Sequence, residues 1–178
     1  LGDVYKRQHF FQTIFPGGFF GVDVFFTFSG FLITALLVEE FSKNHEIDLI
    51  GFFRRRFYRI VPPVVLMVLV TMPFTFLVRQ DYVAGIGGQI AGVLGFMTNF
   101  YELLTGGSYE SQFIPHLFVH NWSLAVEVHY YILWGLAVWF LSKQSRSNGQ
   151  LRGMVFLLSA AAFLISFFSM SVSYTHLR

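Results

Sequence analysis

An acidic residue lies inside one of the most apolar stretches of the chain. The stretch reads WSLAVEVHYYILW from Trp122 to Trp134, and its glutamate is Glu127. A charged side chain at the centre of a membrane helix costs about 2.5–3.5 kcal/mol or more, so it faces the interior of a helix bundle or a wet cavity. Glu127 is therefore a candidate for acid–base or orienting chemistry. A structural hydrogen-bond network between helices is the alternative.

Polar and aromatic side chains recur around this glutamate at three- and four-residue intervals, which places them on one face of a helix. The stripe consists of His120, Ser123, Glu127, Tyr130, Tyr131 and Trp134. We expect it to turn away from lipid and to line a polar site. His129 falls on a different face and is expected to be interfacial or structural.

Basic residues form a second candidate site. The stretch FFRRRFYRIVPP, residues 52–63, holds four arginines in six positions and runs into a span that we expect to begin at its double proline. Arg56 and Arg59 are three residues apart and share one face of a helical turn. Guanidinium groups so placed can grip phosphates with bidentate hydrogen bonds. The alternative is an anchor to anionic lipid headgroups.

A third stretch, residues 9–34, reads HFFQTIFPGGFFGVDVFFTFSGFLIT. The imidazole of His9 can take or give a proton near neutral pH, although a hydrogen-bonded core histidine is the commoner case. Asp23 is expected to be a carboxylate near the start of a helix, where the helix dipole favours an anion. Ser29 and Gly30 are small enough to let another helix approach.

The composition places these residues in a membrane protein. Of 178 residues, 54% are hydrophobic and 12% are charged, whereas soluble domains carry about 25% charged residues. The chain has no cysteine, which excludes disulfides, a thiolate nucleophile and a cysteine-ligated metal; no metal site is predicted. A net charge of +2 gives no reason to expect nucleic-acid binding. The expected fold class is all-α, a polytopic transmembrane helical bundle embedded in the lipid bilayer.

The apolar segments predict about five to six membrane segments in one domain. They fall at residues 9–15, 19–38, 60–78, 84–101, 122–141 and 153–171. About 18 residues suffice to span ~30 Å of hydrocarbon. The whole chain, 1–178, is expected to be part of a larger domain, inactive by itself, with 9–171 informative and both tails resembling adaptor sequence.

Lysine and arginine predict the orientation of the connections. Loops 39–59 and 143–152 are basic and should be cytoplasmic, whereas loop 102–121 has neither Lys nor Arg and should be external. These assignments conflict if 84–101 is a full span. We favour a segment that returns or lies buried without crossing, because its glycines, including the Gly88–Gly92 pair, suit close packing. An ordinary span with a weak charge bias on 143–152 is the alternative.

Taken together, the three stretches resemble the membrane-bound acyltransferase family 3. GGFFGVDVFFTFSGFLIT, FFRRRFYRIVPP and PHLFVHNWSLAVEVHYYILW are similar to its three sequence blocks and occur in the same order. In the last block, His120, Trp122, Ser123 and Glu127 are in register with the same residue types of the family pattern. Val128 and His129 replace the second acid and the glutamine of the family pattern, which weakens any role for that half of the block.

The resemblance implies an enzyme that moves an acyl group from cytoplasmic acyl-CoA to a hydroxyl of a cell-envelope glycan such as peptidoglycan. We expect the acyl group to be acetyl. It implies that His9 and Glu127 are catalytic and that Arg56 and Arg59 bind the donor, all sharing one water-reachable chamber. Supporting roles fall on Asp23, Ser29, His120, Trp122, Ser123 and Tyr130. The expected location is the bacterial cell membrane, with several passes. The competing hypothesis is a non-enzymatic carrier that flips a lipid-linked sugar.

Overall fold

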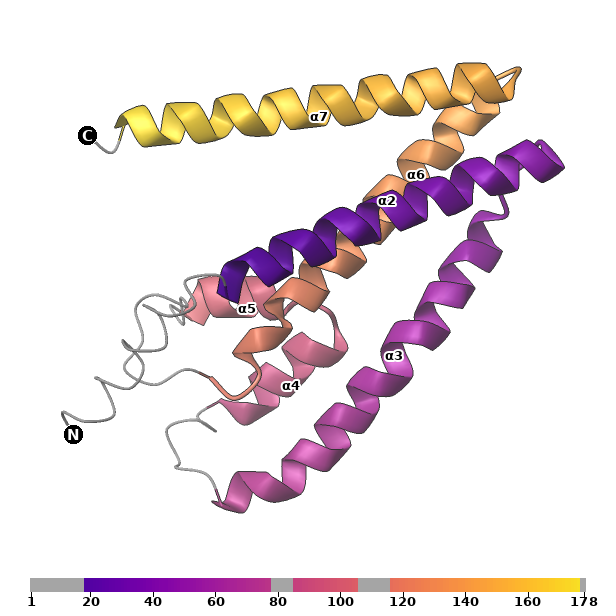
Figure 1. Ribbon diagram of the computed structural model, residues 1–178. Coiled ribbons are helices and arrows are strands. Elements are labelled where there is room, and N and C mark those ends of the chain that lie inside the picture. The colour runs from indigo at the N-terminus through magenta and orange to yellow at the C-terminus, as the bar shows by residue number, and fades with distance from the viewer. Residues whose placement is uncertain (1–17, 78–84, 106–115, 177–178) are drawn as a thin grey trace. The chain divides into compact units, whose positions relative to one another are not determined.

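The computed structural model describes residues 18–77, 85–105 and 116–176, and every regular element in that part of the chain is helical (Figure 1). The elements are α2 (Gly18–Asn44), α3 (Leu49–Phe74), η1 (Thr75–Leu77), α4 (Ile86–Leu94), α5 (Thr98–Thr105), η3 (Val119–Asn121), α6 (Trp122–Gln144) and α7 (Asn148–His176). The predicted all-α class is confirmed. The predicted apolar segment at 9–15 lies outside the described residues.

Four of these helices are long and apolar enough to cross a membrane. The candidate spans are Gly21–Asn44, Leu49–Phe74, Val119–Gln144 and Asn148–Ser169. Large apolar side chains such as Phe28, Leu69 and Phe156 are well exposed on them. Such side chains are stable in contact with lipid, where apolar surface needs no protein cover. The chain is therefore a multi-pass membrane protein.

The arginine-rich segment is helical, and the prediction of a loop over 39–59 was wrong. α2 continues to Asn44, and α3 already begins at Leu49. Between them His45 takes a φ of 56°, and its N–H donates to Phe41 O at 2.8 Å. Phe52 in the first turn of α3 is buried, and arginine and leucine are good helix formers.

The double proline that was expected to open this span lies inside α3 instead. Pro62 and Pro63 both sit in the helix interior, although a proline supplies no N–H to the helix ladder. Helices in membranes tolerate such breaks because neighbouring groups and local adjustment satisfy the freed carbonyls. Proline was therefore a poor boundary signal here.

Segment 84–101 is a pair of short helices rather than an ordinary span. α4 and α5 have 9 and 8 residues, so each is only about 12–14 Å long against ~30 Å of hydrocarbon. They pack tightly: the Tyr101 hydroxyl donates to Gly85 O at 3.3 Å, and a Cβ on Gly88 would lie 2.7 Å from the Tyr101 ring. The close packing expected of its glycines is observed, whereas the expectation that the segment returns or lies buried without crossing stays a prediction.

The chain divides into two compact units, which α2 and α6 both enter. In the described part, the first unit holds α2 up to Leu32 and the residues between Ile50 and Ile132. One of its cores joins Val64 and Val68 of α3 with Val93 and Phe118. Because Val68, late in α3, packs against Phe118, just before α6, the two long helices run antiparallel in this unit.

The second unit brings the two basic connections together. It contains Ile33–Leu49 and the chain from Leu133 onward. Asn148 Nδ2 donates to Ser42 Oγ at 2.8 Å, and Lys143 Nζ lies 3.9 Å from Glu46 Oε1. The α2–α3 and α6–α7 turns therefore lie at the same end of their helices. This agrees with the expectation that both face the cytoplasm, where basic residues are enriched.

We expect Gly88→Val to destabilise the α4–α5 pair, because a β-carbon at that position would press on the Tyr101 ring. Overpacking of this kind costs about 1–3 kcal/mol. The adjacent Gly87→Val is the matched control, since nothing lies within 4 Å of a Cβ there and the helix-propensity cost is the same. Thermal unfolding in detergent measures both; equal melting temperatures would contradict the packing.

A labelling experiment tests the orientation, and the absence of native cysteine leaves a clean background. Glu46→Cys and Ser147→Cys report on the two basic turns, and Leu104→Cys reports on α5. A membrane-impermeant maleimide should label Leu104→Cys in intact cells, whereas the two turn variants should need opened membranes. Labelling of all three in intact cells would refute the shared cytoplasmic side.

Candidate functional site

Glu127 lies on α6 inside the first unit, and its side chain is held by two hydroxyl groups. The residue is only 5% exposed. Ser29 Oγ of α2 donates to Glu127 Oε1 at 3.0 Å, and the Tyr131 hydroxyl, one helical turn further along α6, donates to the same oxygen. A buried carboxylate needs such donors because an unpaired charge in an apolar medium is strongly disfavoured. Ser29 therefore ties α2 to α6 at the level of the carboxylate.

A hollow of about 220 Å³ opens beside this carboxylate. Its polar lining consists of Ser29, Arg56, Arg59, Glu127 and Tyr131, and its apolar lining includes Pro63 and Leu124. The structure thus brings together, in one hollow, a carboxylate from α6 and two guanidinium groups from α3. Both side-chain hydrogen bonds described for this carboxylate go to Oε1, and Glu127 itself lines the hollow.

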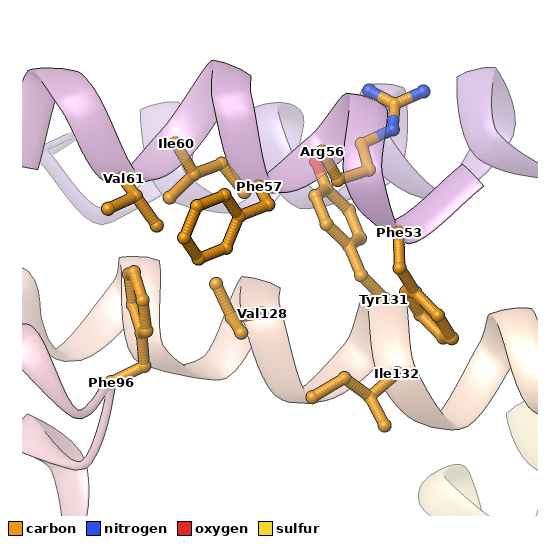
Figure 2. Close-up of a pocket in the computed structure, with 9 residues that line it drawn as sticks. All are labelled: Phe53, Arg56, Phe57, Ile60, Val61, Phe96, Val128, Tyr131 and Ile132. Carbon is orange, nitrogen blue, oxygen red and sulfur yellow. The ribbon is translucent and has the colours of Figure 1, made fainter. Parts of the chain in front are cut away.

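A second, apolar pocket of about 330 Å³ lies on the other side of Arg56 and Tyr131. Figure 2 shows Phe57, Ile60 and Val61 of α3 opposite Val128 and Ile132 of α6, with Phe96 at one end. The guanidinium carbon of Arg56 lies 5.6 Å from the ring centroids of both Phe52 and Tyr131. Aromatic faces attract cations at this distance. Arg56 is therefore oriented by two rings rather than free to swing.

The first hollow can attract an anionic group and hold it next to a carboxylate. Arg56 and Arg59 supply two positive charges, and arginine binds phosphate with paired hydrogen bonds. Glu127 can orient or charge-balance a cationic or proton-carrying group nearby, as carboxylates do for histidine in catalytic triads. The arrangement suits the transfer of a group from a phosphate-bearing donor.

Several of the predicted supporting residues lie elsewhere. Asp23 is exposed and sits beyond the first turn of α2, which contains no acidic residue. His120 is exposed, and its carbonyl accepts a hydrogen bond from Ser123 Oγ at 3.4 Å. Trp122 and Tyr130 are half-buried. None of the five residues lines either pocket described above: Asp23, His120, Trp122, Ser123 and Tyr130.

Tyr130 instead fills the space that a small residue leaves on α2. A Cβ on Gly30 would lie 3.2 Å from the Tyr130 hydroxyl oxygen. The close approach of α6 to the Ser29–Gly30 pair, expected from their small size, is thus observed. Trp134, the last member of the predicted stripe, donates from Nε1 to Thr34 Oγ1 at 2.8 Å within the second unit.

His9, the other predicted catalytic residue, lies outside the described residues. Its expected place in the shared chamber therefore remains a prediction.

Sequence reasoning missed two features. Tyr131 was placed in the polar stripe but was not chosen as a site residue, although it donates to Glu127. A second buried glutamate, Glu102 of α5, contacts His116, with His116 Nδ1 2.9 Å from Glu102 Oε2. The sequence could have indicated Glu102, because it is an acidic residue within the largely apolar stretch NFYELL. Glu127 was selected for the same reason.

We expect Tyr131→Phe to lower the stability of the first unit, because it removes a donor from the buried carboxylate. A hydrogen bond to a charged group contributes about 1.5–3 kcal/mol. Tyr58→Phe is the control, since that side chain is 68% exposed. Unfolding in detergent should separate the two variants. Indistinguishable melting curves would show that the tyrosine hydroxyl does not support Glu127.

Comparisons with known proteins identify the family of the chain. The sequence profile of the acyltransferase domain family matches residues 2–176. O-acetyltransferase OatA of Staphylococcus aureus is 34% identical over 125 residues, which is 70% of this chain and 21% of the relative. Peptidoglycan O-acetyltransferase OatA of Listeria monocytogenes is 33% identical over 119 residues, 66% of this chain and 19% of the relative. No solved structure matches the chain.

The chain thus spans about a fifth of the length of the curated relatives that it resembles. The profile nevertheless covers the helices that carry Ser29, Arg56, Arg59 and Glu127. On this match, and with the four apolar helices that the structure describes, the chain belongs to the membrane-bound acyltransferase family 3.

Proposed function

We propose that the protein takes part in O-acylation of a cell-envelope glycan in the bacterial cell membrane. The acyl group is acetyl, the donor is cytoplasmic acyl-CoA and the acceptor is a hydroxyl of an exported glycan, with peptidoglycan as the first candidate. The family match and the names of the two OatA relatives support acetyl transfer to such a glycan. One observation carries the assignment of the site: Arg56, Arg59 and Glu127 line the same hollow.

In this proposal, the two arginines bind the phosphate groups of the acyl donor. Coenzyme A carries several phosphate groups, and two guanidinium groups on one helical face suit them. Arg56 and Arg59 lie in the first half of α3, on the side of the α2–α3 turn. That turn is the one expected to face the cytoplasm, where acyl-CoA is made. The donor would therefore enter with its phosphates at the arginines and its thioester directed into the bundle.

The acyl transfer itself needs a proton acceptor and a group that orients it. In this proposal His9 either takes the proton of the acceptor hydroxyl or carries the acyl group for a moment. Glu127 balances the charge that develops on an imidazole beside it, as a triad carboxylate does. Ser29 and Tyr131 hold the carboxylate in place, so it does not need to reorganise as charge develops.

The competing hypothesis of a sugar carrier explains less. A carrier would use a polar hollow but has no need of a phosphate-bearing donor on its cytoplasmic side. Membership of the acyltransferase family also favours the enzyme.

Arginine substitutions test the donor assignment. Arg56→Gln and Arg59→Gln should each weaken binding of acetyl-CoA by roughly ten- to a hundred-fold, because a charge-assisted hydrogen bond of about 1.5–3 kcal/mol is lost. Binding of radiolabelled acetyl-CoA to protein-containing membranes, and glycan acetylation at equal expression, would measure the effect.

Arg54→Gln is the matched control, since Arg54 is exposed on the same helix and lines neither pocket. It should bind acetyl-CoA as the unaltered protein does. Equal losses in all three variants would assign the arginines to lipid headgroups, and unchanged binding in all three would refute the donor site.

A further inference from the structure

A second carboxylate partners a histidine away from the hollow that contains Glu127. Glu102 of α5 is buried, and both of its oxygens lie within reach of the ring of His116, at 3.0 and 2.9 Å from Nδ1. The His116 side chain is 20% exposed and that of Glu102 is 9% exposed. The Tyr101 ring lies beside the imidazole, with centroids 5.8 Å apart. The imidazole is thus fixed on one edge and open on another.

This contact leaves the other nitrogen of the ring free to act. In a neutral imidazole, a carboxylate at Nδ1 favours the tautomer with the proton on that nitrogen, which leaves the lone pair on Nε2. Among the described residues the His116 ring has no other hydrogen-bond partner, while its backbone oxygen accepts from Val119 N–H at 3.3 Å. A histidine oriented in this way by a buried carboxylate is the arrangement that general-base catalysis uses.

Two buried polar atoms on α5, in the turn that precedes Glu102, lack a hydrogen-bond partner in the described part of the chain. The atoms are Thr98 Oγ1 and Asn99 Oδ1. Thr98 is 2% exposed and lies one helical turn before Glu102, on the same face of α5. Buried polar atoms are nearly always paired, so a hydroxyl-bearing ligand or water would complete them.

The pair lies toward the end of α3 that is opposite the arginines. His116 precedes Phe118, which packs against Val68 late in α3. Val68 is roughly 18 Å from Arg56 along the helix, at 1.5 Å per residue. If the arginines face the cytoplasm, His116 and Glu102 lie near the external side, from which an exported glycan would arrive.

We propose that His116, held by Glu102, is the general base for the acceptor hydroxyl. This inference rests on the proposed function and changes one step of it: His116, rather than His9, takes the proton of the acceptor hydroxyl. Nε2 takes the proton of a sugar hydroxyl while the hydroxyl oxygen bonds to the acyl carbon of the thioester. The carbon–sulfur bond then breaks, and the proton passes from the imidazolium to the departing sulfur, which leaves as a thiol. His116 touches the substrate and is catalytic; Glu102 is a positioning residue.

The length of the donor is consistent with this placement. The arm of coenzyme A between its phosphates and its sulfur is as long as roughly four extended amino-acid residues, or about 15 Å. A donor whose phosphates lie at Arg56 and Arg59 would therefore present its thioester near the level of His116. The arginines and the pair would hold opposite ends of one reaction path.

The test separates donor binding from acceptor transfer. The full-length protein in membranes is given radiolabelled acetyl-CoA and a soluble peptidoglycan fragment, and both donor binding and the acetylated fragment are measured. His116→Gln should bind acetyl-CoA normally but lower acceptor transfer by about a hundred-fold or more, the usual contribution of a general base. Glu102→Gln should lower the maximal rate of acceptor transfer less, without changing the donor affinity.

Two further variants exclude a purely structural role. His116→Gly should regain acceptor transfer when imidazole is added, because a free base can occupy the vacated space. His45→Asn is the control histidine substitution, in an exposed turn where asparagine tolerates the left-handed backbone. It should transfer normally and show no response to imidazole.

The outcomes distinguish the two proposals. If the unaltered protein transfers acetyl but His116→Gln does so within threefold of its rate, the role of His116 is refuted and the proposed function stands. Equal loss of donor binding and acceptor transfer in His116→Gln, with no rescue by imidazole, would make the pair structural and also refute it. If the unaltered protein transfers nothing from acetyl-CoA, the proposed function fails and this inference fails with it.

Discussion

A carboxylate inside a membrane helix must be solvated by the protein, and the first unit is organised around that need. Glu127 receives one donor from its own helix, Tyr131, and one from α2, Ser29. Water is scarce at this depth, so loss of either donor leaves part of a buried charge uncompensated. The crossing of α2 and α6 is therefore set by hydrogen-bond geometry as well as by packing, and Gly30 supplies the room.

The α4–α5 pair lies in the connection between the end of α3 and the start of α6. The two basic turns lie together in the second unit, so α3 must leave that side and α6 must return to it. Any segment between them has to begin and end on the opposite side. Two short helices, closed by Tyr101 against Gly85 and Gly88, lie in this connection. Glycine is needed because a side chain there would keep the helices apart.

Sequence alone was sufficient for features that follow from periodicity and local composition. The apolar helices, the inward position of Glu127 and the close approach at Gly30 follow from three- and four-residue spacing and from side-chain size. The start of α3 was not predictable from Pro62 and Pro63, because a membrane helix can absorb the missing donors. The partners of Glu127 also required coordinates, since Ser29 lies on another helix and spacing does not say which side chain meets which.

The contact between Glu102 and His116 was beyond sequence reasoning for the same reason. The residues are separated by the 106–115 segment, so no helical period relates them. Their position nevertheless has a physical consequence. Two carboxylates at different depths cannot share one positive partner: Glu127 faces the arginines, whereas Glu102 contacts an imidazole. Permanent charges at one end suit an anion that must be bound, and a titratable partner at the other end suits a proton that must be moved. In the proposed reaction, this division would serve a thioester donor and a hydroxyl acceptor that enter from opposite sides.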